Sequence, residues 1–329
     1  MRLTKLIKYI FCAYLCIFFL GTLKVVFAAE YPIRPIRVIV PFTAGGTTDA
    51  LARVLSRQLE TQMGQTIIVE NRPGANGLLG FEMVAKSNAD GYTILHTSPS
   101  IVTSEFIYKD LHFNFPNDFT AITNISTGTG YLVLVGESSP IKNIQQLIRI
   151  AKEKDNGLSY GSAGVGNTTH LTAELLFSKA NIKLLHIPYK GISESMNAAM
   201  AGDVEVIVTP PTVALPYVKG KRLRALAFTG SKRWSELPDV PTIGESILTN
   251  YEINGGWFAW FLPKGAPSEI TNKLHHEITK ALQTPQVKEF ILKGGYFPDG
   301  RPPEETRKFM QTEILRYGEA IKAAGIKVQ

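Results

Sequence analysis

Apolar residues recur along the first third of the chain in two alternating patterns, one typical of buried strands and one typical of amphipathic helices. Short apolar runs predict strands at 36–40, 66–70 and 92–95. Between them, apolar residues recur at helical spacing, first from Leu51 to Met63 and then over about 78–85. This βαβαβ order predicts an α/β fold with a parallel, doubly wound sheet.

The same alternation begins again after residue 130. Strands are predicted at 131–135, 158–160, 184–188 and 204–208, with helices at about 144–154, after residue 167 and at about 193–200. The last part of the chain contains one predicted strand, 257–262, and helices over 267–283 and about 303–323. A single strand is too little for a separate sheet, so we expect this part to pack back onto the first unit.

Such an order requires the chain to cross between the two units twice, near 124–130 and near 251–256. The predicted first unit is 30–127 together with the returning segment 254–329, and the predicted second unit is 128–253. Four glycines in the crossing segments are expected to supply hinge freedom: Gly128, Gly130, Gly255 and Gly256.

Two segments about 120 residues apart repeat one short pattern, GGTTD at 45–49 and GNTTH at 166–170. Each lies between a predicted strand and a predicted helix. Glycine lets the backbone approach a ligand closely, and the N–H groups of a helix's first turn point at an anion placed there. Either segment alone is typical of an ordinary N-capped helix, but the pair predicts an anion site closed from both sides.

The N-terminus has the pattern of a secretory signal peptide. Basic residues precede an apolar run at 9–23, and Ala28 and Ala29 supply small residues for cleavage after either one, so 1–29 is predicted to be removed. The run is shorter than the roughly twenty residues that span a bilayer, and an uncleaved anchor is the alternative.

Removal of that segment changes the composition. The 35 basic residues become 31, because Arg2, Lys5, Lys8 and Lys24 leave, and the formal net charge falls from +7 to +3 against 28 acidic residues. So small an excess of positive charge, without a cluster of basic residues, indicates that nucleic acid is not a partner. Both cysteines also leave, and the remaining chain is long enough for one large or two medium domains.

The sequence carries no recognisable catalytic or metal-binding motif. Of six histidines only His275 and His276 are close, and neighbours on a helix point to different faces. The segment 161–164 (GSAG) has the wrong spacing for a nucleophile elbow, and the glycine-rich turns match neither a phosphate loop nor a dinucleotide fingerprint. We therefore expect a binding protein rather than an enzyme, with no cofactor and no metal.

Several motifs follow one another over nearly the whole mature chain. They are YP at 31–32, VPFTAGG at 40–46, VENRPGA at 69–75, DGYT at 90–93, YGSAG at 160–164, PYKG at 188–191, LRALA at 223–227 and PDVPT at 238–242. Each is weak alone, but their number and order resemble the substrate-binding proteins of tripartite tricarboxylate transporters, also called Bug receptors.

The resemblance implies a two-lobed periplasmic binding protein of the second structural type, each lobe a doubly wound, mostly parallel sheet with flanking helices. It implies a monomer in the periplasm that captures a small carboxylate between its lobes, a di- or tricarboxylate, an aromatic acid or an acidic amino acid. The receptor would then deliver this ligand to large and small membrane permease subunits.

The resemblance also implies the ligand contacts. Carried over position by position, they are Phe42, Thr43, Ala44, Gly45, Gly46, Thr47 and Asp49 in the first loop, and Ser162, Ala163, Gly164, Gly166, Asn167, Thr168 and His170 in the second. Ser98 and Thr209, which follow strands, are expected to face the distal part of the ligand. Glu205 stands where the family usually has Asp, so its extra carbon shifts a water-bridged contact or only alters a strand end.

Some of these residues have a second interpretation. Asp49 is alternatively a partner of the helix dipole, and His170 a structural hydrogen-bonding residue. Trp257 and Trp260 are expected to pack in the core or between lobes, and Arg72 to hold its loop. Two other functions also stay open: the same module serving a sensor, and an exported enzyme built on this scaffold.

Overall fold

The structure is a computed structural model that describes residues 31–153 and 157–326. The predicted signal peptide lies outside the described residues. Residues from Arg34 onward form one compact unit, in which both lobes lie. Within the described residues no helix combines the length and apolar character needed to cross a membrane.

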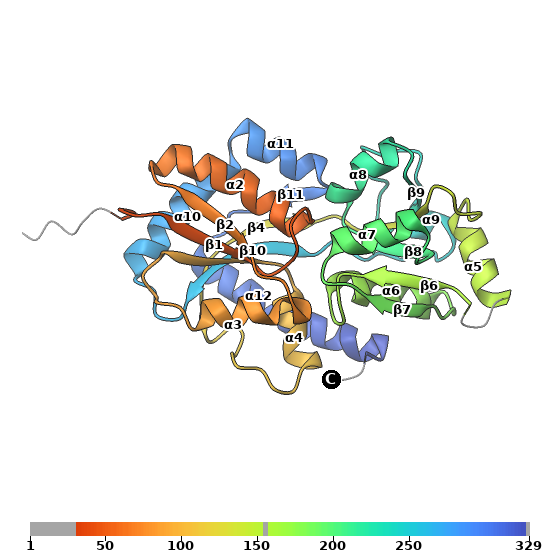
Figure 1. Ribbon diagram of the computed structural model, residues 1–329, viewed down its shortest axis with the longest axis horizontal. Helices are drawn as coiled ribbons and strands as arrows, with labels where there is room; N and C mark the ends of the chain where they lie inside the picture. Colours follow the sequence, from red (N-terminus) through yellow and green to blue (C-terminus); the bar gives the residue numbers. More distant parts are fainter. Residues whose placement is uncertain (1–30, 154–156, 327–329) are drawn as a thin grey trace, which may run out of the picture. The chain divides into compact units, whose positions relative to one another are not determined.

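The first lobe is built on a six-stranded sheet with the order β11-β4-β10-β3-β1-β2. Its strands are β1 (Ile36–Val40), β2 (Ile67–Asn71), β3 (Thr93–Thr97), β4 (Phe119–Gly128), β10 (Trp257–Pro263) and β11 (Tyr296–Pro298). Its helices are α2 (Thr47–Met63), η1 (Ala75–Gly77), α3 (Leu78–Ala85), α4 (Ser100–Ile107), α10 (Ser268–Leu282), α11 (Pro285–Lys293) and α12 (Pro303–Ala324). In Figure 1, α2, α10 and α11 lie on one side of this sheet, and α3, α4 and α12 on the other.

The second lobe is built on a five-stranded sheet with the order β7-β6-β8-β5-β9. Its strands are β5 (Leu132–Gly136), β6 (Ser159–Ser162), β7 (Leu185–Pro188), β8 (Val206–Thr209) and β9 (Leu223–Phe228). Its helices are α5 (Ile144–Glu153), α6 (Thr168–Lys179), α7 (Ile192–Ala201), α8 (Pro211–Lys219) and α9 (Ile243–Ser246).

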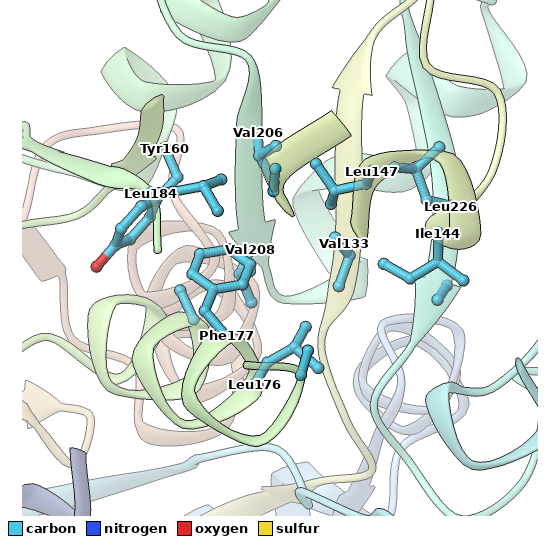
Figure 2. Close-up of a cluster of buried hydrophobic side chains, with 14 of the residues drawn as sticks. Val133, Ile144, Leu147, Tyr160, Leu176, Phe177, Leu184, Val206, Val208 and Leu226 are labelled. Carbon is cyan, nitrogen blue, oxygen red and sulfur yellow. The ribbon is translucent and has the colours of Figure 1, made fainter. Parts of the chain in front are cut away.

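Alternation along the central strands of the second sheet supplies two apolar layers. Val133 of β5 and Val208 of β8 pack on one face against α5 and α6, as Figure 2 shows with Leu147 and Phe177. The intervening Leu134 belongs to the layer on the other face, together with side chains of α7 and α8. Because successive side chains of a strand point to opposite faces, continuous apolar runs fit a sheet that is covered on both sides.

Both sheets are mixed, and most strands of each run in one direction, in agreement with the expected doubly wound, mostly parallel arrangement. The strands β1, β2 and β3 are parallel to one another, as are β6, β7 and β8, whereas β10, β4 and β11 pair antiparallel, as do β5 and β9 with their neighbours. The reason is the double crossing. A strand that enters from the other lobe starts at the edge where β1 or β8 ends, so it must run in the opposite direction.

Sequence patterns missed several elements. The strand β4 covers residues where a crossing was expected to begin, and the returning segment contributes β11 as well as β10. The short β11 pairs with β4 through Tyr296 and Gly128, and it therefore depends on a partner that is distant in the sequence. The return of this segment to the first sheet agrees with the sequence pattern.

The crossing glycines allow the two crossing segments to pack closely, and their hinge freedom stays a prediction. None of the four has a positive φ. A Cβ built on Gly255 would lie 2.6 Å from the Cα of Gly128, and one on Gly130 would lie 2.7 Å from the backbone nitrogen of Gly230. The N–H of Gly128 donates to the carbonyl of Gly256 over 2.7 Å. The two crossing segments thus touch backbone to backbone, where no side chain fits.

We predict that Gly255→Ala destabilises the fold by about 1–3 kcal/mol, because its methyl group would overlap backbone atoms that have no rotamer to adjust. Urea unfolding followed by circular dichroism measures this. Gly244→Ala is the control, since the nearest atom to its Cβ lies at 3.3 Å. Equal stability of the two variants would contradict the packing role.

Candidate functional site

The two glycine turns occupy matching places in the two lobes. The first connects β1 to α2 and the second connects β6 to α6. Gly45 and Gly166 adopt left-handed φ angles of 80° and 76°, which favour glycine. The N–H of Gly45 donates to Asp49 Oδ2 over 2.9 Å, and the N–H of Gly166 donates to His170 Nδ1 over 3.0 Å. In each turn, a side chain four residues later therefore holds the glycine in place.

Asp49 is fully engaged in supporting the first turn. Its carboxylate also accepts hydrogen bonds from the side chains of Arg53 and Asn71 at 2.9–3.1 Å. Burial raises the pKa of Asp49, but the hydrogen bonds from Arg53, the Gly45 N–H and Asn71 outweigh it, so the net pKa is lowered. Asp49 stays ionised, and it does not line the cavity between the lobes.

His170 supports the second turn as a neutral imidazole. Its ring stacks on His186, with centroids 3.9 Å apart and planes 7° from parallel. Burial, followed by the proximity of His186, lowers the pKa of His170 to about 3, and burial lowers the pKa of His186 to about 4. His186 Nε2 lies 2.6 Å from Ser162 Oγ, which also accepts from the N–H of Gly164 over 3.1 Å. The stacked pair thus supports the loop at both ends, through Ser162 at the end of β6 and Gly166 before α6.

A small cavity lies between the N-termini of α2 and α6. The space that the centres of water-sized molecules can occupy in it is about 50 Å³. It is lined by Phe42, Thr43, Gly46, Thr47, Thr48, Ser98, Pro99, Tyr131, Ala163, Asn167, Thr168, Thr169, Ile192, Pro210, Gly256, Trp257, Phe258 and Tyr296. These residues come from both lobes and from both crossing segments.

Two residues that line the cavity carry hydroxyl groups without a partner in the part of the chain that the structure describes. Thr43 Oγ1 and Thr47 Oγ1 are buried and make no hydrogen bond with another described residue. Thr47 as a whole is 4% exposed, and it opens α2 just as Thr168 opens α6. Buried hydroxyls are normally paired, so two unpaired ones in a cavity indicate a place for a ligand atom or a water.

Hydrogen bonds join the lobes directly around the cavity. Asn167 Nδ2 donates to Asn76 Oδ1 over 3.2 Å and to Ser100 Oγ over 3.0 Å. Thr103 Oγ1 donates to the carbonyl of Gly166 over 2.6 Å. On the first loop, Ser193 Oγ donates to the carbonyl of Ala44 over 3.2 Å. The structure therefore has its lobes closed on one another.

The predicted site residues divide into a lining group and a supporting group. The lining group is Phe42, Thr43, Gly46, Thr47, Ser98, Ala163, Asn167 and Thr168. The remaining ones do not line the cavity, and most of them shape the loops from behind: Ala44, Gly45, Asp49, Ser162, Gly164, Gly166, His170 and Thr209. A family motif does not distinguish the two groups, because both are needed to build the same turn.

Glu205 lies away from the cavity. It precedes β8, whereas Thr209 ends this strand at the cavity-facing edge. Its carboxylate accepts from both the N–H and the hydroxyl of Ser159 at 2.7 Å, at the start of the neighbouring β6. The expected ligand contact is therefore corrected to a strand-end contact, one of the two alternatives that the sequence left open.

Sequence reasoning missed the aromatic part of the lining. Trp257, Phe258, Tyr131 and Tyr296 lie at or beside the crossing segments, which fold together only in the tertiary structure. Trp257 also donates its indole N–H to Glu313 Oε2 over 2.8 Å, whereas the Trp260 indole donates to His96. The available signal was the position of these aromatic residues next to the crossing glycines.

The chain matches the family model described as "Tripartite tricarboxylate transporter family receptor" over residues 51–326. It belongs to this receptor family. The protein BugT of Bordetella pertussis is 32% identical over 312 residues, which cover 94% of this chain and 95% of the relative.

Arg72, within a family-like motif, forms an ion pair with Glu70 at 3.0 Å, in agreement with its predicted role in holding the loop.

Solved structures of similar proteins show the same two-lobed fold as this receptor. The periplasmic binding protein BugD superposes with a TM-score of 0.85 at 30% identity, over 91% of this chain and all of the other. R. palustris Rpa4515, solved with adipate, gives a TM-score of 0.87 at 31% identity with the same coverage. The family and the fold inferred from the sequence motifs are confirmed.

The stacked histidines predict a pH dependence of the receptor's stability. Their folded pKa values, about 3 and about 4, lie below the usual value near 6.5 for an unfolded chain. Between pH 6.5 and 4 the unfolded chain therefore binds more protons, so stability is present above pH 6.5 and falls as the pH drops. The loss reaches at most about 1.4 kcal/mol per pH unit for each histidine.

The test compares unfolding between pH 7 and 4 for wild type and His186→Gln, which cannot titrate. The variant should lose stability less steeply as the pH falls. Burial raises the pKa of neighbouring Glu174, so protonation of this residue favours the folded state as the pH falls. This opposes part of the loss of stability, equally in both proteins. His112→Gln, at an exposed histidine, is the control and should retain the wild-type slope. An unchanged slope in His186→Gln would rule out this origin.

Proposed function

We propose that this protein is a periplasmic solute receptor that binds one small carboxylate in the cavity between its lobes and delivers it to a tripartite tricarboxylate transporter. The observation that carries the proposal is the pair of buried, unpartnered hydroxyls of Thr43, in the loop before α2, and Thr47, the first residue of α2. The N-terminus of α6 lines the same cavity through Thr168. Two helix N-termini together favour an anion.

The proposed contacts are the residues that line the cavity from the two loops. Thr43, Gly46 and Thr47 would receive the carboxylate from the first lobe, and Asn167 and Thr168 from the second. Neutral donors suit reversible capture, because no buried cation must regain its hydration when the ligand leaves. Asp49, His170 and Ser162 would act by holding the glycine turns rather than by touching the ligand.

The family context supports the cellular role. The chain's family is a transporter receptor family, and its structural relative BugD is a periplasmic binding protein. We propose that residues 1–29 direct export, that 30–127 with 254–329 and 128–253 are the two lobes, and that lobe closure presents the ligand to large and small permease subunits.

A serine–histidine pair in the second lobe has the geometry of some enzyme sites. Ser162 Oγ and His186 Nε2 are 2.6 Å apart, a distance suited to nucleophile activation. Ser162 is, however, fully buried behind the loop and does not line the cavity. A substrate carbonyl in the cavity would not meet its oxygen, which supports a receptor rather than a hydrolase.

The decisive experiment is a thermal-shift screen of mono-, di- and tricarboxylates against the mature protein, followed by calorimetry of those that stabilise it. We expect stabilisation that grows with ligand concentration, since a ligand that binds only the folded state raises the melting temperature. Uncharged amides of the same acids are the matched controls. If amides stabilise the protein as well as acids do, the carboxylate assignment fails.

We predict that Thr47→Val weakens carboxylate binding by about 1–3 kcal/mol, since it removes a hydroxyl donor from a buried anion. Stability without ligand should be unchanged or higher, because this hydroxyl has no partner among the described residues. Ser56→Ala, in the same helix, removes another buried unpartnered hydroxyl that does not line the cavity. Calorimetry should show wild-type affinity for Ser56→Ala; a similar loss in both variants would contradict the contact.

A further inference from the structure

We propose that each glycine turn is held by the opposite lobe, and that these direct contacts between the lobes help to set how tightly and for how long the receptor holds an acid. The inference rests on the proposed carboxylate receptor and concerns the regulation of that same site. Its two main residues, Thr103 and Gly191, do not line the cavity, so they would act on lobe closure rather than on the ligand.

The second glycine turn is held by α4 of the first lobe. Thr103 Oγ1 donates to the carbonyl of Gly166 over 2.6 Å, and both residues are buried. A Cβ built on Gly166 would lie 2.2 Å from Cδ1 of Ile107, in the same helix. Tyr108, which follows α4, donates its hydroxyl to the carbonyl of Val165 over 3.2 Å. The turn thus lies directly against the opposite lobe, with no room for a side chain at its left-handed glycine.

The first glycine turn is held in return by the start of α7, in the second lobe. Ser193 Oγ donates to the carbonyl of Ala44 over 3.2 Å. Gly191, the N-cap of α7, lies so close that a Cβ built on it would be 2.0 Å from Thr43 Oγ1 and 3.1 Å from Thr43 Cβ. Its φ of −175° is extended backbone that any residue adopts. The position therefore favours glycine because of the contact with Thr43, not because of the local backbone.

These contacts exist only while the lobes touch. When the lobes separate, the hydroxyls of Thr103 and Ser193 lose their acceptors in the opposite lobe. The Thr103 hydroxyl also lies 3.2 Å from the carbonyl of Ser100 in its own helix, so it keeps an acceptor in an open receptor and closure can reverse. A contact present in one of two arrangements shifts the equilibrium between them, and this equilibrium multiplies the affinity of any ligand that both lobes hold.

The first test is Thr103→Val, which removes the hydroxyl and keeps a branched side chain of similar size. Ser104→Ala is the matched control, because Ser104 is equally buried in α4 but its hydroxyl donates to the carbonyl of Ile101 in the same helix over 2.8 Å. Calorimetry measures affinity and stopped flow measures dissociation. The probes are succinate, adipate, citrate and benzoate, with any other acid that stabilises the wild-type protein in the thermal-shift screen.

The distance between the lobes is measured in the same variants by electron–electron double resonance, without acid and with saturating acid. Spin labels are attached to Arg57→Cys in α2 and Arg149→Cys in α5, two exposed positions in different lobes. The chain after residue 29 contains no other cysteine, so the labels are specific.

The loss expected for Thr103→Val appears in one of the two measurements. If the wild-type lobes are mostly open without acid, every bound acid is weakened by the same factor, about threefold or more, through faster dissociation. If they are mostly closed, the variant shifts the lobe distance without acid toward the open value. Ser104→Ala should match wild type in both. Wild-type affinities together with wild-type distances in Thr103→Val overturn the proposal.

The second test is Gly191→Ala, which places a methyl group against Thr43. We expect longer lobe distances and faster dissociation of acids, whereas Gly244→Ala, in the same lobe and with its nearest neighbour at 3.3 Å, should keep the wild-type values. In a Thr43→Ala background the hydroxyl that the new methyl group meets is absent. Gly191→Ala should therefore change the lobe distance much less there. An equal effect in both backgrounds overturns the contact.

The outcomes separate this inference from the proposed function. A loss in Thr103→Val that differs strongly from one acid to another indicates a ligand contact, which overturns the role in closure and leaves the carboxylate receptor intact. Failure of all carboxylates to bind overturns the proposed function. The lobe distances without acid then decide the present inference, and wild-type lobes that never reach the closed distance overturn it as well.

Discussion

The double crossing of the chain between its lobes is the constraint on which the rest of the structure depends. A strand that enters a lobe from the other one must start at the edge where the parallel strands end, so β5 and β10 run against their neighbours. The two crossings also meet backbone to backbone at Gly128 and Gly255. This close contact brings aromatic residues beside the crossings, Tyr131, Trp257 and Tyr296, to the cavity that both loops line.

In both glycine turns the N–H of the glycine is accepted by a side chain four residues later, but the two side chains differ in chemistry. In the first lobe an ionised carboxylate, Asp49, accepts the glycine N–H, and in the second a neutral imidazole, His170, does so. Asp49 is balanced by Arg53, whereas His170 is kept neutral by burial and by its stack on His186. The two supports therefore have the same geometry, but only the second one is expected to make folding stability depend on pH in mildly acidic conditions.

The sequence motifs identified both loops correctly because local rules govern them. Glycine at a left-handed φ and glycine or asparagine at a helix N-cap, here Gly46 and Asn167, are preferences of single residues, and they are visible without a partner. The same motifs did not separate Thr47, which lines the cavity, from Asp49, which does not line it. That separation depends on where Arg53 and Asn71 sit, and Asn71 lies on another strand.

The sequence by itself determined the α/β class, the positions of the main parallel strands and the two loops, since apolar periodicity and turn chemistry are encoded over a few residues. Only the tertiary structure decided the direction of the crossing strands, the existence of β11, the packing role of the glycines and the position of Glu205 away from the cavity. Each of these depends on contacts between residues distant in the chain. Local sequence cannot specify such contacts, because a side chain's preference says nothing of which distant backbone it meets.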